Sequence, residues 1–299
     1  GFVRGTLSHQ RKGWSKEEDK NKLVSFKETI DWICSFLGQK INEIKVDNEE
    51  IANKKFVAQM TTMVKEKSKP SGMTREKVKS SLLIPAPYFL KQGYSKQILE
   101  RYDIGFCNAT GREMFERTVA PIYDEKYQVM VACTGKSIHG KCEHCTLYHN
   151  PKMKCPVDEK YKELKYSKWR NSANSSVSSY LYNYWFAREH IQKTGTIILV
   201  EGPADVWRLE ELGIHNSVAL FGLEMSDEQQ IIIEMSGALN VVVLLDMDGP
   251  GRAAITELRK KLERSYRVFV PEMSVNDPGD YNAKIVEEEL SPILKGIQK

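Results

Sequence analysis

The chain reads TIILVEGPADVWRLEELG at residues 196–213 and VVVLLDMDGPG at residues 241–251. Each stretch opens with an unbroken run of apolar, largely β-branched residues, which is typical of a parallel strand buried on both faces. A helix should follow the first run, because Pro203 suits a first helical turn and apolar residues then recur at helical spacing. Two further apolar runs, at 217–221 and 266–270, continue the alternation. The pattern predicts an α/β fold with a mostly parallel sheet and flanking helices.

Acidic residues stand where these strands end. Glu201 comes directly after the first strand, and Asp246 and Asp248 follow the third. The ends of neighbouring parallel strands lie about 5 Å apart, so these side chains should converge. Crowded carboxylates repel one another unless a hard cation such as Mg²⁺ or Mn²⁺ holds them. Any one of them could be a solvated loop residue or a helix cap. Together they predict a divalent-metal site, whose further candidate ligands are Asp205, Asp277 and Asp280.

Charge is distributed unevenly along the 299 residues. Residues 196–299 carry 10 Lys and Arg against 18 Asp and Glu, whereas residues 1–195 carry 34 against 22. The basic first part suits a polyanion, and the acidic second part suits cations. No apolar run is long enough to span a bilayer, and no secretory leader opens the chain. We therefore expect a cytoplasmic globular protein without membrane contact.

Four of the six cysteines lie between residues 133 and 155. Within this segment the spacing Cys142-x2-Cys145-x3-His149-x5-Cys155 is that of zinc ligands. Thiolate and imidazole ligands around zinc can fold a short loop that has little apolar material of its own. The alternative is a surface loop with free thiols. We predict a structural zinc site, with Cys133, His139 and His144 as reserve ligands.

The rest of the chain divides into two parts. Residues 1–80 contain a predicted helix at 25–37, which opens with a Ser25–Glu28 capping box, and a Lys-rich linker. Residues 81–195 should form a basic α+β subdomain with two strands around a turn at 118–135. We take 133–156 as an insertion, 157–176 as a loop by composition and 177–191 as a helix.

Three phrases in the second half resemble the acidic motifs of the Toprim domain: VEGPADVWRLEELGI (200–214), LLDMDGPGRAA (244–254) and NDPGDYN (276–282). Upstream, PAPYFLKQGYSKQILERYDIGF (85–106), KYSKWRNS (165–172) and LYNYWFAREHI (181–191) resemble the RNA-polymerase core of DnaG-type primases of bacteria and phages. The helix at 25–37 resembles the one that trails the zinc ribbon of these enzymes. One departure is Gly279, which stands where the primase motif has its second aspartate.

The resemblance implies a function and assigns residues to it. It implies a DNA primase that joins ribonucleoside triphosphates on a single-stranded DNA template, with a replicative helicase as a candidate partner. It makes Glu201, Asp246 and Asp248 the catalytic carboxylates of a domain at 196–299. It also implies contacts to nucleic acid or nucleotide from a set of mostly basic residues: Arg117, Lys136, Lys165, Lys168, Trp169 and Arg170.

Other interpretations of these residues remain open. The cations could be solvated surface charges, and Trp169 could cover the edge of a core. A Toprim nuclease would use the same carboxylates with water as the nucleophile, and a nucleic-acid-binding module could carry a Toprim site without catalysis. A topoisomerase is disfavoured because it needs a separate tyrosine domain.

Overall fold

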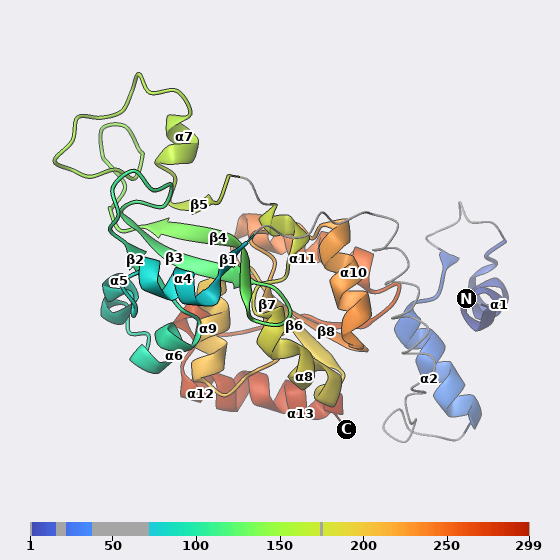
Figure 1. Cartoon of the computed structure of the whole chain (residues 1–299). Helices are drawn as coiled ribbons and strands as arrows, with labels where there is room; N and C mark the ends of the chain where they lie inside the picture. The colour runs from blue at the N-terminus through green and yellow to red at the C-terminus, as the bar shows by residue number, and fades with distance from the viewer. Residues whose placement is uncertain (1, 16–21, 38–71, 174–175, 299) are drawn as a thin grey trace.

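The computed structural model describes residues 2–15, 22–37, 72–173 and 176–298 and contains two sheets (Figure 1). The carboxy-terminal sheet has the order β7-β6-β8-β9 with every pair parallel. This confirms the predicted parallel sheet and all four of its strands: β6 (Thr196–Val200), β7 (Ser217–Ala219), β8 (Asn240–Leu244) and β9 (Arg267–Phe269).

Alternate residues of the central strand β6 enter two different cores. Ile198 and Val200 pack with the side of α9 that carries Trp207, whereas Ile197 and Leu199 pack with apolar residues of the helices across the sheet. All five residues of β6 are buried, which explains the unbroken apolar run. The flanking helices are α8 (Tyr184–Thr194), α9 (Pro203–Glu211), α10 (Asp227–Ser236) and α11 (Gly249–Leu262).

The chain closes with four short helical segments. An isolated 3-10 turn is followed by a nearly continuous helical run, which adds Val286, Leu290 and Ile297 to the core beside α9. The segments are η4 (Pro278–Asp280), α12 (Ala283–Ile285), the π-helical η5 (Val286–Leu290) and α13 (Ser291–Gln298). None of the helices in the described ranges is both long and apolar enough to cross a membrane.

The second sheet is antiparallel, with the order β1-β4-β3-β2 and β5 paired to β4. The predicted strand pair is confirmed as the long hairpin β3–β4, which turns at Asp124. The strands are β1 (Met73–Thr74), β2 (Gly105–Cys107), β3 (Arg117–Tyr123), β4 (Val129–Ser137) and β5 (Trp169–Asn171). Beside them lie α4 (Arg75–Ser81), α5 (Pro87–Lys91) and α6 (Lys96–Arg101).

Aromatic side chains join the two sheets into one core. Trp207 of α9 lies edge-on to Phe89 of α5, with ring centroids 4.9 Å apart. Its indole N–H donates to the hydroxyl of Tyr182 at 2.8 Å. Tyr102 stacks on the other side of Tyr182 at 6.0 Å. The rings therefore fix the antiparallel sheet against the helix that follows the first carboxylate.

Two expectations about local structure need correction. Residues 157–176 are not all loop, because they contain α7 (Lys162–Lys165) and strand β5, which is formed by pairing with β4. The segment expected as one helix at 177–191 begins with a 3-10 turn, η3 (Val177–Ser179), and its α-helix, α8, begins only at Tyr184. Composition could not show β5, because this strand forms only by pairing with β4, which is distant along the chain.

The amino-terminal part contains α1 (Phe2–Lys12) and α2 (Phe26–Leu37). The predicted capping box is confirmed: the Ser25 N–H donates to Glu28 at 2.6 Å and the Glu28 N–H donates to the Ser25 hydroxyl at 3.1 Å. Arg4 of α1 donates to the carbonyls of Val24 and Arg264, which ties the helix pair to the end of α11. Most of the predicted Lys-rich linker lies outside the described residues.

A buried carboxylate fastens α4 to the antiparallel sheet. Asp103 is fully buried, and its carboxylate accepts from Arg75 at 2.6 and 3.2 Å and from the Tyr123 hydroxyl at 2.9 Å. Its φ of 53° lies in the left-handed region, which Asp and Asn tolerate best among residues with a side chain. Shape, charge and backbone thus all favour aspartate at this position.

Asp103→Ala should therefore lower the free energy of unfolding by about 3 kcal/mol, because Arg75 loses its buried partner. Asp103→Asn should cost less, since it keeps the volume and tolerates the left-handed backbone. Urea unfolding followed by circular dichroism would measure both variants. A loss below about 1 kcal/mol for the alanine variant, within the range of an exposed ion pair, would contradict this role.

Candidate metal centres and nucleic-acid surface

The parallel pairing of β6 with β8 brings the predicted carboxylates together. Val200 is in register with Leu244, so Glu201 and Asp246 leave neighbouring strands at the same edge. Asp248 caps α11, and its Oδ1 accepts from the Gly251 N–H at 2.7 Å. A Cβ on Gly251 would lie 1.8 Å from the Asp246 carbonyl oxygen, so only glycine lets the helix start this close to the strand end.

Asp205 and Asp277 complete the group from two other elements. Asp205 lies in the first turn of α9, almost fully buried, and accepts from the Gly202 N–H at 2.8 Å. Asp277 accepts from the Gly279 N–H at 2.7 Å. The Cβ position of Gly279 is 2.9 Å from Asp277 Oδ1 and 3.6 Å from Asp205 Oδ1, so these carboxylates face each other across that glycine.

The carboxylates perturb one another strongly. Burial, and then repulsion by Asp277, Asp246 and Glu201, raise the pKa of Asp205 to about 8. Burial and the same kind of repulsion, to which Asp280 adds, raise the pKa of Asp246 to about 6. The pKa of Glu201 is also raised, first by burial and then by Asp248 and Asp277. Oxygen ligands that repel in this way fit a hard divalent cation such as Mg²⁺ or Mn²⁺.

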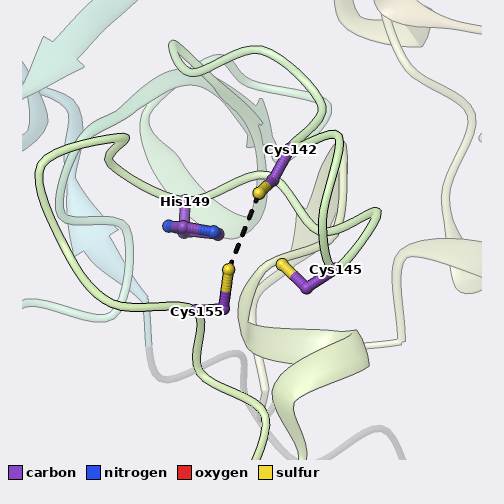
Figure 2. A group of neighbouring side chains, drawn as sticks. All are labelled: Cys142, Cys145, His149 and Cys155. Carbon is purple, nitrogen blue, oxygen red and sulfur yellow. Dashed lines mark hydrogen bonds between the residues drawn. The ribbon is translucent and has the colours of Figure 1, made fainter.

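The predicted zinc ligands also come together (Figure 2). The ligand atoms of Cys142, Cys145, His149 and Cys155 all lie within 4.8 Å of one another, and Cys142 Sγ is 3.8 Å from Cys155 Sγ. Cys133, one of the reserve ligands, is buried within β4 instead. The segment thus offers four ligands to one ion, which is the number that a closed structural zinc site requires.

The chemistry of these ligands fits zinc. The backbone N–H groups of Cys145 and His144 lower the pKa of Cys142 to about 6, whereas the neighbouring thiols raise that of Cys155 to about 11. His149 Nδ1 pairs with the Asn150 carbonyl at 2.9 Å, and the described part of the chain offers no hydrogen-bond partner to the buried Nε2. A bound zinc ion would neutralise the neighbouring thiolates and would accept this nitrogen as a ligand.

Sequence reasoning missed the residues that hold this cluster in place. Glu116, at the start of β3, contacts His139 Nε2 at 2.9 Å and accepts from the Asn150 side chain at 3.3 Å. Asn150 in turn supplies the carbonyl for His149. No sequence signal marks Glu116, because its partners lie 23 and 34 residues away along the chain.

Two of the expected nucleic-acid contacts, Lys168 and Lys136, keep side chains that are exposed or partly exposed. Lys168 is exposed and close enough to Glu201 to oppose the rise of its pKa. Lys136 pairs with Trp169 across β4 and β5, and its Nζ lies 5.7 Å from the Trp169 ring centroid and 5.1 Å from that of Tyr88. Trp169 itself packs against the core, as the alternative interpretation had it.

The other three expected cations are engaged within the chain. Arg117 is buried and donates to the carbonyls of Gly135, Lys165 and Ser167. Arg170 donates to Glu113, and the Lys165 ammonium pairs with Glu159 at 2.6 Å. The contacts of Arg117 thus hold the base of the β4–β5 connection and leave its charge away from the surface.

A known family model matches this same region. The model described as the Toprim domain matches residues 195–270, which include Glu201, Asp205, Asp246 and Asp248. Residues 195–270 form a Toprim domain. The Toprim resemblance of the first two phrases is therefore confirmed, whereas NDPGDYN lies beyond the matched residues.

Relatives extend the likeness beyond the Toprim domain. The DNA primase of Staphylococcus aureus (strain MSSA476) is 32% identical over 121 residues, which make up 40% of this chain and 20% of that protein. The matched part thus spans about a fifth of the length of this curated relative.

Solved structures show that the fold is that of DnaG-type primases. The crystal structure of the Aquifex aeolicus primase (zinc binding and RNA polymerase domains) matches with a TM-score of 0.57 at 19% identity, over 91% of this chain and 67% of that one. The structure of the DnaG primase catalytic domain bound to ssDNA matches with a TM-score of 0.50 at 17% identity, over 84% and 79%.

Zinc content provides a direct test of the cysteine cluster. The purified chain should hold about one zinc ion, and Cys142→Ser should remove it, because a tetrahedral structural site does not tolerate the loss of a thiolate. Cys133→Ser makes the same substitution outside the cluster and should leave the zinc content unchanged. Elemental analysis would measure all three proteins. An absence of zinc from the parent would refute the site.

The carboxylate cluster should make the metal-free protein less stable. At a pH above the raised pKa of about 6, Asp246 carries a negative charge that the neighbouring carboxylates repel, whereas Asn in its place would be neutral. Asp246→Asn should therefore stabilise the metal-free chain, by on the order of 1 kcal/mol after solvent screening. The difference should shrink as the pH falls from about 6 toward 3.8, the ordinary value, because folding then protonates Asp246.

Melting temperatures in EDTA and in Mg²⁺ would check this. Mg²⁺ should raise the melting temperature of the parent and have much less effect on the variant. A variant that is less stable than the parent in EDTA, yet is equally stabilised by Mg²⁺, would be incompatible with Asp246 as a ligand.

Proposed function

We propose that this chain is the RNA-polymerase core of a DnaG-type DNA primase. In this proposal residues 196–299 are the catalytic domain, 81–195 a basic subdomain with the insertion at 133–156, and 1–80 an amino-terminal helix and Lys-rich linker. The observation that carries the proposal is the convergence of Glu201 and Asp246 from adjacent parallel strands, with Asp248 beside them. The activity would be the synthesis of RNA primers on single-stranded DNA in the cytoplasm.

The chain's own residues support the chemistry of nucleotidyl transfer. Glu201, Asp205, Asp246, Asp248 and Asp277 would hold Mg²⁺ or Mn²⁺, with Asp280 at the rim. A divalent ion bound there supplies positive charge for the triphosphate and for the attacking 3′-hydroxyl. The hydrogen bond from the Gly202 N–H to Asp205 fixes the loop that carries Glu201. The fold holds these groups in place, and positioning of the reactants is the catalytic contribution that we expect from them. No covalent enzyme intermediate is needed for the transfer.

Lys168 supplies positive charge near the carboxylates of the acidic edge. Its ammonium partly offsets the rise in the pKa of Glu201, so an anion bound between them would meet a carboxylate-held metal and a lysine. A template strand and incoming ribonucleoside triphosphates both present such phosphates. The similar DnaG primase catalytic domain solved bound to ssDNA supports the same partner here. A replicative helicase is the protein partner that we expect.

The test is an incubation with single-stranded DNA, labelled ribonucleotides and Mg²⁺ or Mn²⁺. The parent should make short RNA, and Glu201→Gln should abolish synthesis while leaving folding and DNA affinity near normal, since it removes charge at nearly constant volume. Glu257→Gln, an exposed position on α11, is the matched control and should retain full activity. Cut DNA would indicate a Toprim nuclease, and binding alone a non-catalytic module. Full synthesis by Glu201→Gln would overturn the assignment.

A further inference from the structure

The connection between β4 and β5 projects away from both sheets (Figure 1). It leaves β4 after Ser137 and returns through Lys168, whose carbonyl accepts from the Ser137 N–H at 2.9 Å. The β4–β5 pair beneath it carries Lys136 and Trp169. Lys168, at the base of this projection, is also a cation that opposes the rise in the pKa of Glu201.

The outer part of this projection exposes unusually large apolar side chains. Met153, Val157, Tyr161 and Leu164 are 53%, 54%, 68% and 58% exposed. They are four of the nine exposed large apolar side chains in the described ranges, although they fall within twelve consecutive residues. Apolar exposure that is concentrated in this way generally marks a binding surface.

Tyr161 is presented at a backbone cost. Its φ of 61° and ψ of 27° are left-handed, a conformation that disfavours a bulky side chain. The Tyr161 carbonyl accepts from the Lys165 N–H at 2.9 Å and so begins α7, which holds the ring outward. The Lys160 ammonium lies 4.9 Å from the ring centroid. The local fold thus keeps a cation and an exposed aromatic ring together.

The exposed apolar residues alternate with lysines. Residues 139–170 contain eight Lys and Arg against four Asp and Glu. Lys152, Lys154 and Lys160 are exposed next to Met153 and Tyr161. A partner that fits this alternation must present negative charges and flat apolar groups at short intervals. Single-stranded nucleic acid does so, with phosphates and unstacked bases, whereas a duplex hides its base faces.

We propose that residues 152–164 bind single-stranded DNA outside the catalytic edge, with Tyr161 stacking on a base and Lys152, Lys154 and Lys160 contacting phosphates. This inference rests on the proposed function, because it assigns a second contact to the same template. The Cys142–Cys155 cluster orders the loop from which this surface extends. The surface grips a strand without base-specific readout, because stacking and phosphate contacts accept any sequence.

Substitution of Tyr161 separates binding from folding. Tyr161→Gly removes the ring and relieves the left-handed backbone, so its melting temperature and zinc content should equal or exceed those of the parent. Its affinity for a thymidine oligonucleotide, measured by fluorescence anisotropy with the full zinc-loaded chain, should fall by roughly tenfold or more. Tyr161→Phe keeps the ring and should bind like the parent. Affinity for a blunt duplex should change little in either variant.

The lysines should show in the salt dependence. Replacing Lys152, Lys154 and Lys160 with Ala should reduce the slope of log affinity against log salt by about 2 units on a single strand. Lys193→Ala with Lys260→Ala removes exposed charge elsewhere and should leave the slope unchanged. An unchanged affinity of Tyr161→Gly together with an unchanged slope in the triple variant would overturn the proposal and favour a protein partner for this surface.

Primer synthesis distinguishes this inference from the proposed function. If the parent makes primers, but Tyr161→Gly binds DNA normally and the triple lysine variant keeps the salt slope of the parent, the inference fails by itself. If the parent makes none, yet Tyr161→Gly still loses affinity for the single strand, the primase assignment fails and the binding surface stands.

Discussion

The pairing of β6 with β8 is the constraint on which the site depends. Five consecutive residue pairs, from Thr196 with Asn240 to Val200 with Leu244, fix the register of the two strands. Both strands are buried on both faces, so a slip would move every side chain from one core into the other. The register therefore cannot relax to relieve the repulsion between Glu201 and Asp246. Packing on two sides holds together acids that electrostatics would separate.

The cysteine cluster repeats this arrangement with softer ligands. The neighbouring thiols raise the pKa of Cys155, and a buried imidazole nitrogen finds no hydrogen-bond partner among the residues that the structure describes. In the carboxylate site the sheet supplies the order that opposes repulsion. In the cysteine cluster the order comes from turns and from Glu116, since few apolar groups are available. Hard oxygen ligands at a rigid edge suit a catalytic ion, and a closed sulfur and nitrogen set suits a structural one.

The aromatic core links these two regions. Trp207, on the helix after Glu201, packs against Phe89, and Phe89 lies under Lys136 of β4. A shift of the antiparallel sheet would therefore also displace the helix that carries Asp205. The two sheets are thus parts of one packed unit.

Much of this could be predicted from the sequence. The strands at 196–200 and 241–245 and the acids that follow them were identifiable because periodicity and strand ends are local properties. The cysteine spacing likewise predicted that Cys142, Cys145, His149 and Cys155 lie together, as they do. The Tyr161 surface also lies within one short segment, but its presentation depends on a left-handed backbone angle that composition does not reveal.

Only the tertiary structure determined which groups Arg117 and Arg170 contact and that β5 forms a strand. Arg117 and Arg170 looked like phosphate ligands, yet carbonyls and Glu113 occupy their donors. Lys168, two residues from Arg170, instead faces Glu201. Sequence by itself determined which groups are charged and where strands end. Whether a cation meets a carbonyl, a glutamate or open solvent depends on residues tens of positions away, which only the folded chain brings into contact.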